Sequence, residues 1–323
     1  MRIVFMGTPD FAVPCLEILI NNGYEVVGVV TQPDRPAGRK QSELKAPPVK
    51  QFALEKGIPA ILQPEKVRTR EFADSIGTLS PDLIVTAAYG RIITREVLDI
   101  PPLGCINVHG SLLPKYRGAA PMQWAIINGE SETGITTMFM DEGMDTGDML
   151  LVRKLPIPQD MTYSELYEKL KALGADTLLE TLRELEAGKL ARTPQDPSEA
   201  TVVPMMTKEM GLINWNKSAE EIHNLVRGTD PWPGAFTYYR GGRLKIWKTR
   251  RMTGDDPMAL DVGSMLEGKT PPVPGSILKI TKDSLVVVAG CGYLHVLEVQ
   301  SESGRKMEVR ECGHNMNEGE VLG

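Results

Sequence analysis

The chain has 323 residues, of which 41% are hydrophobic and 24% charged, and its formal net charge is -6. This balance is typical of a folded protein and excludes a disordered or low-complexity chain. No apolar stretch approaches the roughly 18 residues that a membrane span needs, and the first residues lack signal-peptide organisation. The four cysteines are scattered without C-x-x-C or metal-ligand spacing, which favours free thiols in a reducing compartment. We therefore expect a cytoplasmic protein with no membrane association and no metal.

Strand-like apolar runs alternate with helical stretches through the first part of the chain. Strands are expected at residues 2–6, 25–31, 82–87, 104–108 and 134–140, and helices at 10–22, 122–128 and 162–187. Glycine follows the first and the last of these helices directly. The alternation predicts an α/β domain over residues 1–188, built on a Rossmann-like, doubly wound and mostly parallel sheet.

The pattern changes after residue 188. Residues 189–206 contain three prolines among polar residues and show no periodicity, so they are expected to form a linker. Beyond a short helix at 218–227, turn-punctuated strands are expected at 243–248, 276–280, 284–289 and 293–299. This pattern predicts a C-terminal OB-like β-barrel domain over residues 207–323.

Basic residues are concentrated in one part of this second domain. Residues 207–323 hold 15 basic and 15 acidic residues, so the acidic excess of the chain lies in the first part. Strand alternation would place Arg243 and Lys245 on one side and Leu244 and Ile246 toward the core. Such a basic stripe indicates contact with a polyanion, although a solvated surface is the commoner meaning of a local basic run.

The most informative stretch of the chain begins at residue 104. If residues 105–108 form a strand, Asn107 and His109 project to the same side, because side chains alternate with period two. The amide can donate to a developing oxyanion and the imidazole changes protonation near neutral pH, so the pair suits attack on a carbonyl. A core histidine whose hydrogen bonds are satisfied is the alternative.

Two other classes of site are disfavoured. No G-x-G-x-x-G follows any expected strand, which argues against nicotinamide or flavin chemistry. The acidic segment at residues 141–148 lacks the glycine and glutamate positions of a calcium loop. A single carboxylate from this segment facing His109 is the better interpretation.

Several motifs together resemble the folate-dependent formyltransferases, and the resemblance covers nearly the whole chain. Two of them resemble the catalytic segments of that family: Asn107-Val-His109-Gly-Ser-Leu-Leu-Pro114-Lys-Tyr-Arg117 and Met144-Asp145-Thr-Gly147-Asp148. Three more are similar to the branch that acts on tRNA: Gly7-Thr-Pro-Asp-Phe-Ala12, Thr31-Gln-Pro-Asp-Arg-Pro-Ala-Gly-Arg39 and Asp230-Pro-Trp-Pro-Gly-Ala-Phe236.

The resemblance implies transfer of a formyl group from 10-formyltetrahydrofolate to the α-amino group of initiator methionyl-tRNA. It implies a catalytic trio of Asn107, His109 and Asp145. It also implies folate contacts from Ser111, Leu112, Leu113, Pro114, Tyr89 and Gly90.

The partner implied is the tRNA itself. The contacts expected for it are Arg35, Arg39, Lys40, Lys45, Arg243, Lys245 and Lys248. The first four belong to residues 32–50, where prolines and Gly38 forbid a long helix, so we expect a mobile basic loop there. No obligate protein partner is evident.

Three other functions remain open at this point. A sugar-nucleotide formyltransferase shares the catalytic trio and the folate donor, but does not need the basic segment. A glycinamide ribonucleotide formyltransferase needs no large C-terminal domain. A nucleic-acid-binding module without catalysis is the third, and loss of activity on replacement of His109 excludes it.

Overall fold

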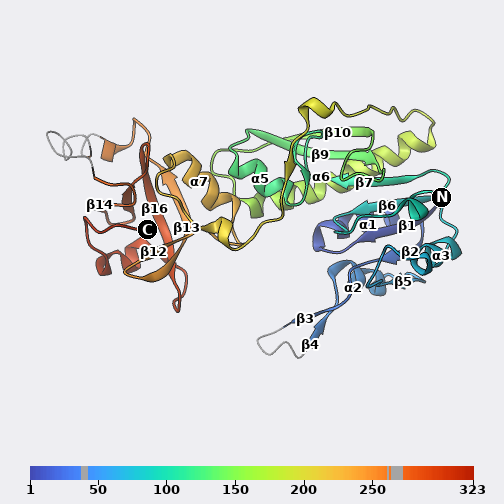
Figure 1. Cartoon of the computed structure of the whole chain (residues 1–323), viewed down its shortest axis with the longest axis horizontal. Coiled ribbons are helices and arrows are strands. Elements are labelled where there is room, and N and C mark those ends of the chain that lie inside the picture. The colour runs from blue at the N-terminus through green and yellow to red at the C-terminus, as the bar shows by residue number, and fades with distance from the viewer. Residues whose placement is uncertain (38–42, 260–261, 263–271) are drawn as a thin grey trace. The chain divides into compact units, whose positions relative to one another are not determined.

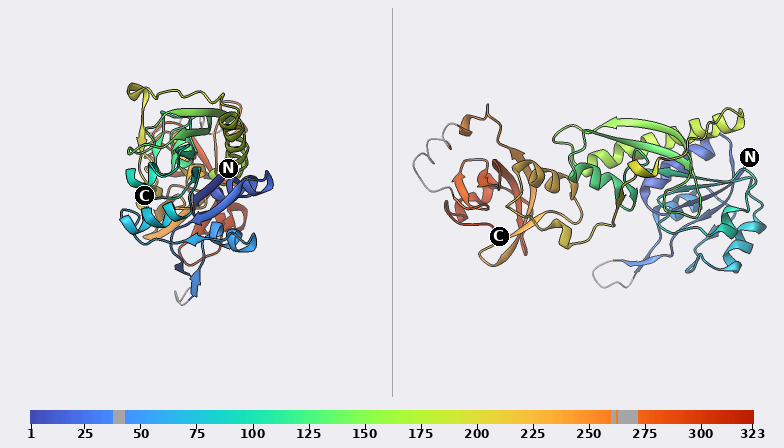
Figure 2. Two further views of the ribbon diagram at one scale, coloured as in Figure 1. Left: turned by 90° about the vertical axis from the view of Figure 1, so that its right-hand side faces the viewer. Right: turned by 45° about the horizontal axis from the view of Figure 1, so that its top comes forward.

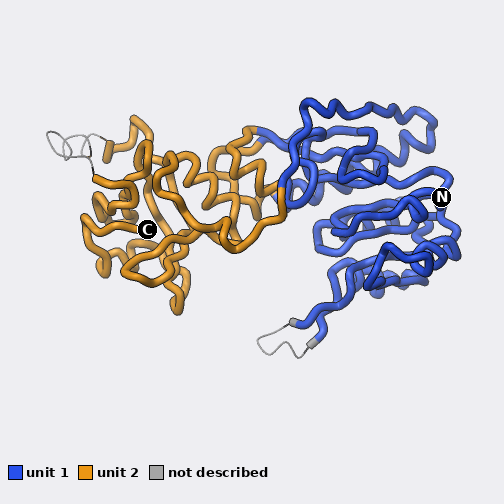
Figure 3. Tube along the Cα trace, in the orientation of Figure 1, with its two compact units in different colours: residues 1–121, 132–156, 167–203 blue, residues 122–131, 157–166, 204–323 orange. Residues whose placement is uncertain are grey.

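The computed structural model describes residues 1–37, 43–259, 262 and 272–323. The chain forms two compact units, which Figure 3 colours separately. Unit 1 contains residues 1–121, 132–156 and 167–203, and unit 2 contains residues 122–131, 157–166 and 204–323. The two units exchange segments along the chain, so their limits are not those of two consecutive domains. That residues 1–188 and 207–323 fold as separate domains stays a prediction.

A seven-stranded sheet forms the centre of unit 1 (Figure 1). Its strands in spatial order are β10 (Met149–Pro156), β9 (Glu132–Phe139), β7 (Cys105–His109), β6 (Leu83–Ala87), β1 (Arg2–Gly7), β2 (Glu25–Val30) and β5 (Ile61–Leu62). The strands from β7 to β5 are parallel, whereas β9 runs antiparallel to β7 and β10 antiparallel to β9. The mostly parallel sheet expected from the sequence is therefore confirmed. The carboxyl ends of β1, β6 and β7 consequently lie along one edge of the sheet.

The helices expected in the first part of the chain are present. These are α1 (Val13–Asn21) with the preceding turn η1 (Asp10–Ala12), α5 (Pro121–Ile127), which falls almost wholly in unit 2, and α6 (Tyr163–Glu186). Three shorter helices were not expected: α2 (Pro48–Glu55), α3 (Arg70–Thr78) and α4 (Arg95–Leu98). Each has at most nine residues, which is shorter than the window of about 11–18 residues over which a helical period of apolar positions is recognised.

Part of the basic segment between β2 and α2 is paired backbone rather than loop. It forms a hairpin in which β3 (Arg35–Ala37) pairs antiparallel with β4 (Glu43–Lys45), and the hairpin extends away from the sheet of unit 1 in Figure 1. Lys50 donates to both oxygens of Asp34 and to Gln63, and so fixes the base of the hairpin. The expectation of a loop was wrong for Arg35–Ala37 and Glu43–Lys45, because the prolines forbid a helix but not an isolated two-stranded ribbon. The expected mobility stays a prediction, and residues 38–42 lie outside the described residues.

The segment expected as a linker also carries structure. A short turn, η2 (Pro197–Glu199), precedes β11 (Val202–Val203), which pairs in parallel with β8 (Arg117–Gly118). A strand of two residues is too short to create an alternating pattern, so no periodicity in the sequence indicates it. Residues up to 203 are thus fastened to unit 1.

Unit 2 is built on an antiparallel sheet that forms an OB-like half-barrel, as expected (Figures 1 and 2). Its path is β12 (Phe236–Tyr239), β13 (Gly242–Arg251), β16 (Tyr293–Ser301), β15 (Leu285–Val288) and β14 (Ile277–Ile280), with β17 (Met307–Glu308) beside β16. The described part of unit 2 also contains η3 (Glu209–Gly211), α7 (Ala219–Gly228), α9 (Val309–Cys312) and η4 (Gly313–Asn315). Helix α7 begins with a capping box in which Ser218 and Glu221 each bond the other's backbone amide. Leu244 and Ile246 of β13 are buried in the core, so the expected facing of that strand is confirmed.

Across the described ranges, none of the helices combines the length and the apolar character needed to cross a membrane.

Two histidines are enclosed in unit 2. The Nδ1 atom of His295 lies 2.9 Å from the hydroxyl of Ser284, and its Nε2 atom lies 3.1 Å from the carboxylate of Asp256. His223 contacts the hydroxyl of Thr249 through Nδ1 at 2.9 Å. Burial lowers the pKa of both imidazoles below the ordinary value of 6.5. The folded protein therefore favours their neutral forms.

Unit 2 should lose stability on mild acidification. Between the folded and unfolded pKa values the unfolded chain binds more protons, so stability is full above about pH 6.5 and falls below it. Each histidine contributes at most about 1.4 kcal/mol per pH unit. Urea unfolding followed by tryptophan fluorescence measures this, because all four tryptophans belong to unit 2. His295→Gln should flatten the pH dependence, whereas the exposed control His314→Gln should preserve it. If the free energy of unfolding of His295→Gln depended on pH as in the wild type, the contribution assigned to His295 would be contradicted.

Candidate active site

Two polar side chains emerge from the end of β7. Asn107 lies beside Thr86 of β6 in the parallel pairing, and His109 lies beside Thr136 of β9 in the antiparallel pairing. Because they are two residues apart on one strand, Asn107 and His109 project from the same face of the sheet. This is the arrangement expected from strand alternation.

Thr86 orients the amide of Asn107. Its hydroxyl lies 2.7 Å from Oδ1 of Asn107 and donates to it. The oxygen end of the amide is therefore held against β6, and the Nδ2 hydrogens are the donors that remain for a ligand. Since Asn107 is half-buried, a ligand reaches this group from the sheet edge.

The imidazole of His109 is almost fully enclosed, with 6% of the residue exposed. Its Nε2 atom lies 2.9 Å from the carbonyl oxygen of Tyr116. A carbonyl only accepts, so Nε2 carries a hydrogen and donates it. The Nδ1 atom faces Oδ1 of Asp145 at 3.7 Å. Nδ1 is thus the ring nitrogen that faces the carboxylate of Asp145.

Asp145 belongs to the connection between β9 and β10. Its φ angle is +57°, a left-handed conformation that costs a residue with a side chain about 1 kcal/mol. The amide of Gly118 donates to Oδ2 at 2.8 Å. Gly147 lets this connection fold back closely, since a Cβ there would lie 1.9 Å from the carbonyl oxygen of Phe139. The structure therefore brings the expected trio of Asn107, His109 and Asp145 together.

Sequence reasoning missed the residues that support this trio. Thr86 could have been found by aligning the ends of the two neighbouring strands. Gln195 could not, because it lies in the segment expected as a linker. Its amide donates to the carbonyl oxygens of Asp145 and Gly147, and its Oε1 accepts from Arg117.

The residues after β7 that were expected to contact folate form a tight turn: Ser111, Leu112, Leu113 and Pro114. The hydroxyl of Ser111 donates to the carbonyl oxygen of Lys115 at 2.7 Å, and Thr136 donates to the carbonyl oxygen of Ser111 at 2.7 Å. Leu113 is buried, whereas Leu112 is half-buried. Leu112 therefore keeps part of its apolar side chain accessible at the end of β7, and Leu113 belongs to the core.

Tyr89 and Gly90 follow β6 at the same edge of the sheet. The side chain of Tyr89 packs in the core of unit 1, and burial raises its pKa to about 12. Its carbonyl oxygen accepts hydrogen bonds from Thr8 and Gln32. Gly90 is exposed with a φ angle of +78°. The phenol ring of Tyr89 is therefore enclosed and its carbonyl oxygen already bonded, so Gly90 is the exposed residue of this pair.

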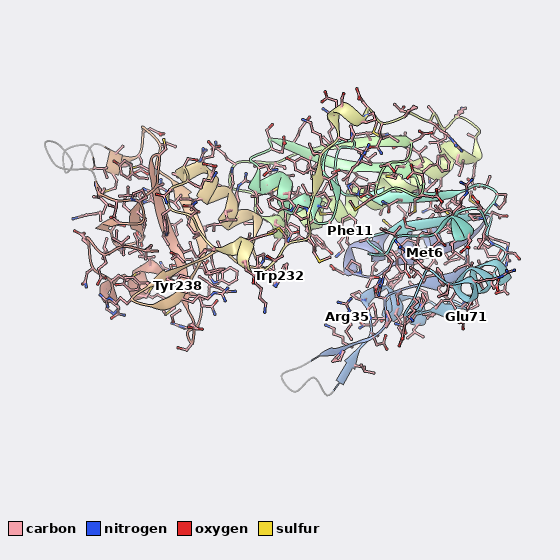
Figure 4. All side chains as sticks on the ribbon, viewed as in Figure 1. Met6, Phe11, Arg35, Glu71, Trp232 and Tyr238 are labelled. Atoms are coloured by element: carbon pink, nitrogen blue, oxygen red, sulfur yellow. The ribbon has the colours of Figure 1, made fainter. Side chains whose placement is uncertain are left out.

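Two of the four basic residues expected in the hairpin fall within the described residues. Arg35, labelled in Figure 4, and Lys45 lie opposite each other on β3 and β4, and both are exposed. Arg39 and Lys40 lie outside the described residues.

The basic residues of β13 differ in their surroundings. The guanidinium of Arg243 stacks on Phe236 at 4.0 Å, and the amine of Lys245 lies 4.8 Å from the ring of Trp247. Burial, followed by the nearby Arg243, lowers the pKa of Lys245. Lys248 is exposed because the pairing with β16 shifts register on either side of it, which breaks the alternation that would turn it inward. Two aromatic side chains of unit 2, Trp232 and Tyr238, are also partly exposed (Figure 4).

The fold and this site define a formyltransferase. Residues 1–182 match the formyl transferase family and residues 205–316 match its C-terminal domain, so the chain belongs to that family. Its full-length relatives include the methionyl-tRNA formyltransferases of Acetivibrio thermocellus, 56% identical, and of Clostridioides difficile, 48% identical. Both alignments cover 100% of this chain and 100% of the relative.

Solved structures of lower identity share the fold. An N-formyltransferase of Helicobacter canadensis, in complex with folinic acid and dTDP-3-aminofucose, is 18% identical with a TM-score of 0.64 over 92% of this chain and 98% of that one. HypX of Aquifex aeolicus, in complex with tetrahydrofolic acid, is 18% identical with a TM-score of 0.61 over 100% of this chain and 50% of that one.

Gly118 should be irreplaceable. Its φ angle is +95° and a Cβ would lie 2.7 Å from the carbonyl oxygen of Val203. Gly118→Ala should therefore lower the free energy of unfolding of unit 1 by roughly 2–4 kcal/mol. Gly188 is the matched control: its φ angle is +65° with nothing within 4 Å, so Gly188→Ala should cost about 1 kcal/mol. Denaturant unfolding followed by circular dichroism measures both, and equal losses would contradict the argument.

Proposed function

We propose that this protein transfers the formyl group of 10-formyltetrahydrofolate to the α-amino group of initiator methionyl-tRNA. The observation that carries the proposal is the convergence of Asn107, His109 and Asp145 at the carboxyl edge of the sheet. Full-length relatives about half identical to the chain support the tRNA acceptor, whereas structures of sugar formyltransferases are 18% identical. A role in translation initiation implies a cytoplasmic protein.

The chemistry follows from the side chains present. The amine nitrogen attacks the formyl carbon, a new C–N bond forms, and the bond from that carbon to N10 of the folate breaks. Asn107 Nδ2 and protonated His109 stabilise the negative charge that develops on the formyl oxygen. Asp145 accepts the proton that the amine loses and returns it to Nδ1 of His109, which passes a proton to the departing N10, so that both side chains end as they began.

The strand ends fit a folate. A pterin needs a flat apolar contact and a few polar groups along its amide edge. Leu112 supplies apolar surface, and the exposed backbone of Gly90 after β6 supplies polar groups at the same edge. The hydrogen bonds of Ser111 with Lys115 and Thr136 fix the turn that carries Leu112 before a ligand arrives.

Basic side chains on both units suit contact with tRNA phosphates. Arg35 and Lys45 on the hairpin are exposed, as is Lys248 on β13. Arg243 and Lys245 hold their charges over aromatic rings, which adds a stacking surface to the charge. Arg39 and Lys40 belong to the same proposal through the sequence alone.

A direct assay of the acceptor tests the proposal. The protein is incubated with 10-formyltetrahydrofolate and either initiator methionyl-tRNA or an amino-sugar nucleotide, and the formylated product is identified. Asn107→Ala, His109→Ala and Asp145→Asn should each lower kcat by at least about a hundred-fold, because their interactions strengthen in the transition state. KM for the formyl donor should change little.

His314→Ala is the matched control, because it removes an exposed histidine far along the sequence from the trio. Formylation of the sugar alone would refute the proposal. A folded trio variant with normal kcat would remove that residue from the mechanism.

The affinity for tRNA should fall as the salt concentration rises. Log affinity should fall by roughly 0.7 to 0.9 per phosphate neutralised for each unit of log salt. Replacing Arg243 and Lys245 together by Gln should reduce that slope by about one to two, with kcat at saturating tRNA unchanged. The charge-matched control replaces Lys66 and Arg70, both exposed on unit 1, and should leave the slope as it is. Equal slopes in the two double variants would exclude β13 from the tRNA contacts.

A further inference from the structure

Gln195 uses every polar atom of its side chain within unit 1. Its Nε2 group donates to the carbonyl oxygens of Asp145 at 2.9 Å and of Gly147 at 2.7 Å. Its Oε1 atom accepts from Nε of Arg117 at 3.0 Å and from Nη2 at 2.8 Å. A side chain with four such bonds has one orientation available to it.

These bonds form a closed ring around Asp145. The ring runs from the amide of Gln195 to the backbone of Asp145, and from the Asp145 carboxylate to the amide of Gly118. It continues through the peptide bond to Arg117 and from the Arg117 guanidinium back to Gln195. Both ends of the Asp145 residue, its backbone and its carboxylate, are therefore held by the same set of partners.

The segment that carries Gln195 is itself fixed on either side. Before it, Thr193 exchanges two backbone hydrogen bonds of 2.9 Å with Met149 at the start of β10. After it, the carbonyl oxygens of Thr201 and Val203 accept from the amides of Arg117 at 2.8 Å and Ala119 at 3.2 Å. Gln195 thus reaches the Asp145 backbone from a rigid support.

We propose that Gln195 is a positioning residue for formyl transfer, which holds the Asp145 backbone so that its carboxylate faces Nδ1 of His109. The inference rests on the proposed function for its chemistry. Asp145 is in a left-handed conformation, from which the backbone relaxes unless its neighbours hold it. A modest rotation there moves the carboxylate by an ångström or more, enough to lower the rate by about ten- to a hundred-fold.

Two substitutions separate the two ends of the amide. Gln195→Met keeps the length and removes all four bonds. Gln195→Glu keeps two acceptors for Arg117 but removes both donors to the Asp145 and Gly147 carbonyls. If the donor end matters, both variants should lower kcat by about tenfold or more, with KM for both substrates within about twofold of the wild type.

A double-mutant comparison shows whether Gln195 acts through Asp145. In the Asp145→Asn background, Gln195→Met should lower the residual kcat no further, because the carboxylate that it positions is already gone. A loss of the same factor in both backgrounds would overturn the proposal and indicate general loosening. Asp196→Ala is the matched control. It removes the carboxylate that accepts from the Ser198 amide in the same segment, and it should leave kcat unchanged.

Amide hydrogen exchange provides a test that needs no substrate. The Gly118 amide donates to the Asp145 carboxylate, while the neighbouring amides of Arg117 and Ala119 donate to Thr201 and Val203. In Gln195→Met and Gln195→Glu, exchange at Gly118 should accelerate by about tenfold while the two neighbours keep their wild-type rates.

Failure of the proposed function and failure of the positioning role of Gln195 give different results. A wild-type protein that does not formylate methionyl-tRNA refutes the proposed function, and the exchange at Gly118 still decides whether Gln195 positions Asp145. Unchanged exchange at Gly118, or equal acceleration of all three amides, overturns the positioning role whatever the acceptor is.

Discussion

The site depends on one contact between distant parts of unit 1, the hydrogen bond from the Gly118 amide to the Asp145 carboxylate. Strand β7 fixes Asn107 and His109 by its own pairing, but Asp145 lies on an irregular connection with no strand to hold it. The 2.8 Å bond from Gly118 and the close return of the chain at Gly147 bring the carboxylate to the imidazole. Gly118 itself must be glycine, because Val203 of β11 lies against it. A charge in the active site is thus held by backbone packing from three segments.

Sequence patterns predicted the parts of the fold that repeat. The strands of unit 1 and helix α6 are long enough to show their periodicity. The projection of Asn107 and His109 from the same face of the sheet follows from strand alternation. The hairpin at β3 and β4 and the two residues of β11 are too short for any period to appear. Gln195 was missed for a related reason: its role comes from tertiary contacts, and nothing in its neighbours along the chain indicates them.

Strand β13 of unit 2 shows where the alternation of side chains predicts burial correctly and where it does not. Alternation predicted the outward facing of Arg243 and Lys245 and the burial of Leu244 and Ile246. It would have turned Lys248 inward, but the register shifts in the pairing with β16 turn it outward. The rings under Arg243 and Lys245 were not foreseen, since Phe236 and Trp247 meet these charges through strand pairing and side-chain packing. Such a combination of charge and aromatic surface suits a nucleic acid better than a charge run alone.

The account assigns the proton exchange with Asp145 to Nδ1 of His109, because Nε2 donates to the carbonyl of Tyr116. Nitrogen-15 NMR of histidine-labelled protein measures this directly, and the chain has only four histidines to assign. We expect neutral His109 to carry its hydrogen on Nε2. A neutral form with the hydrogen on Nδ1 would contradict the assignment, because Nε2 could then not donate to the carbonyl oxygen of Tyr116.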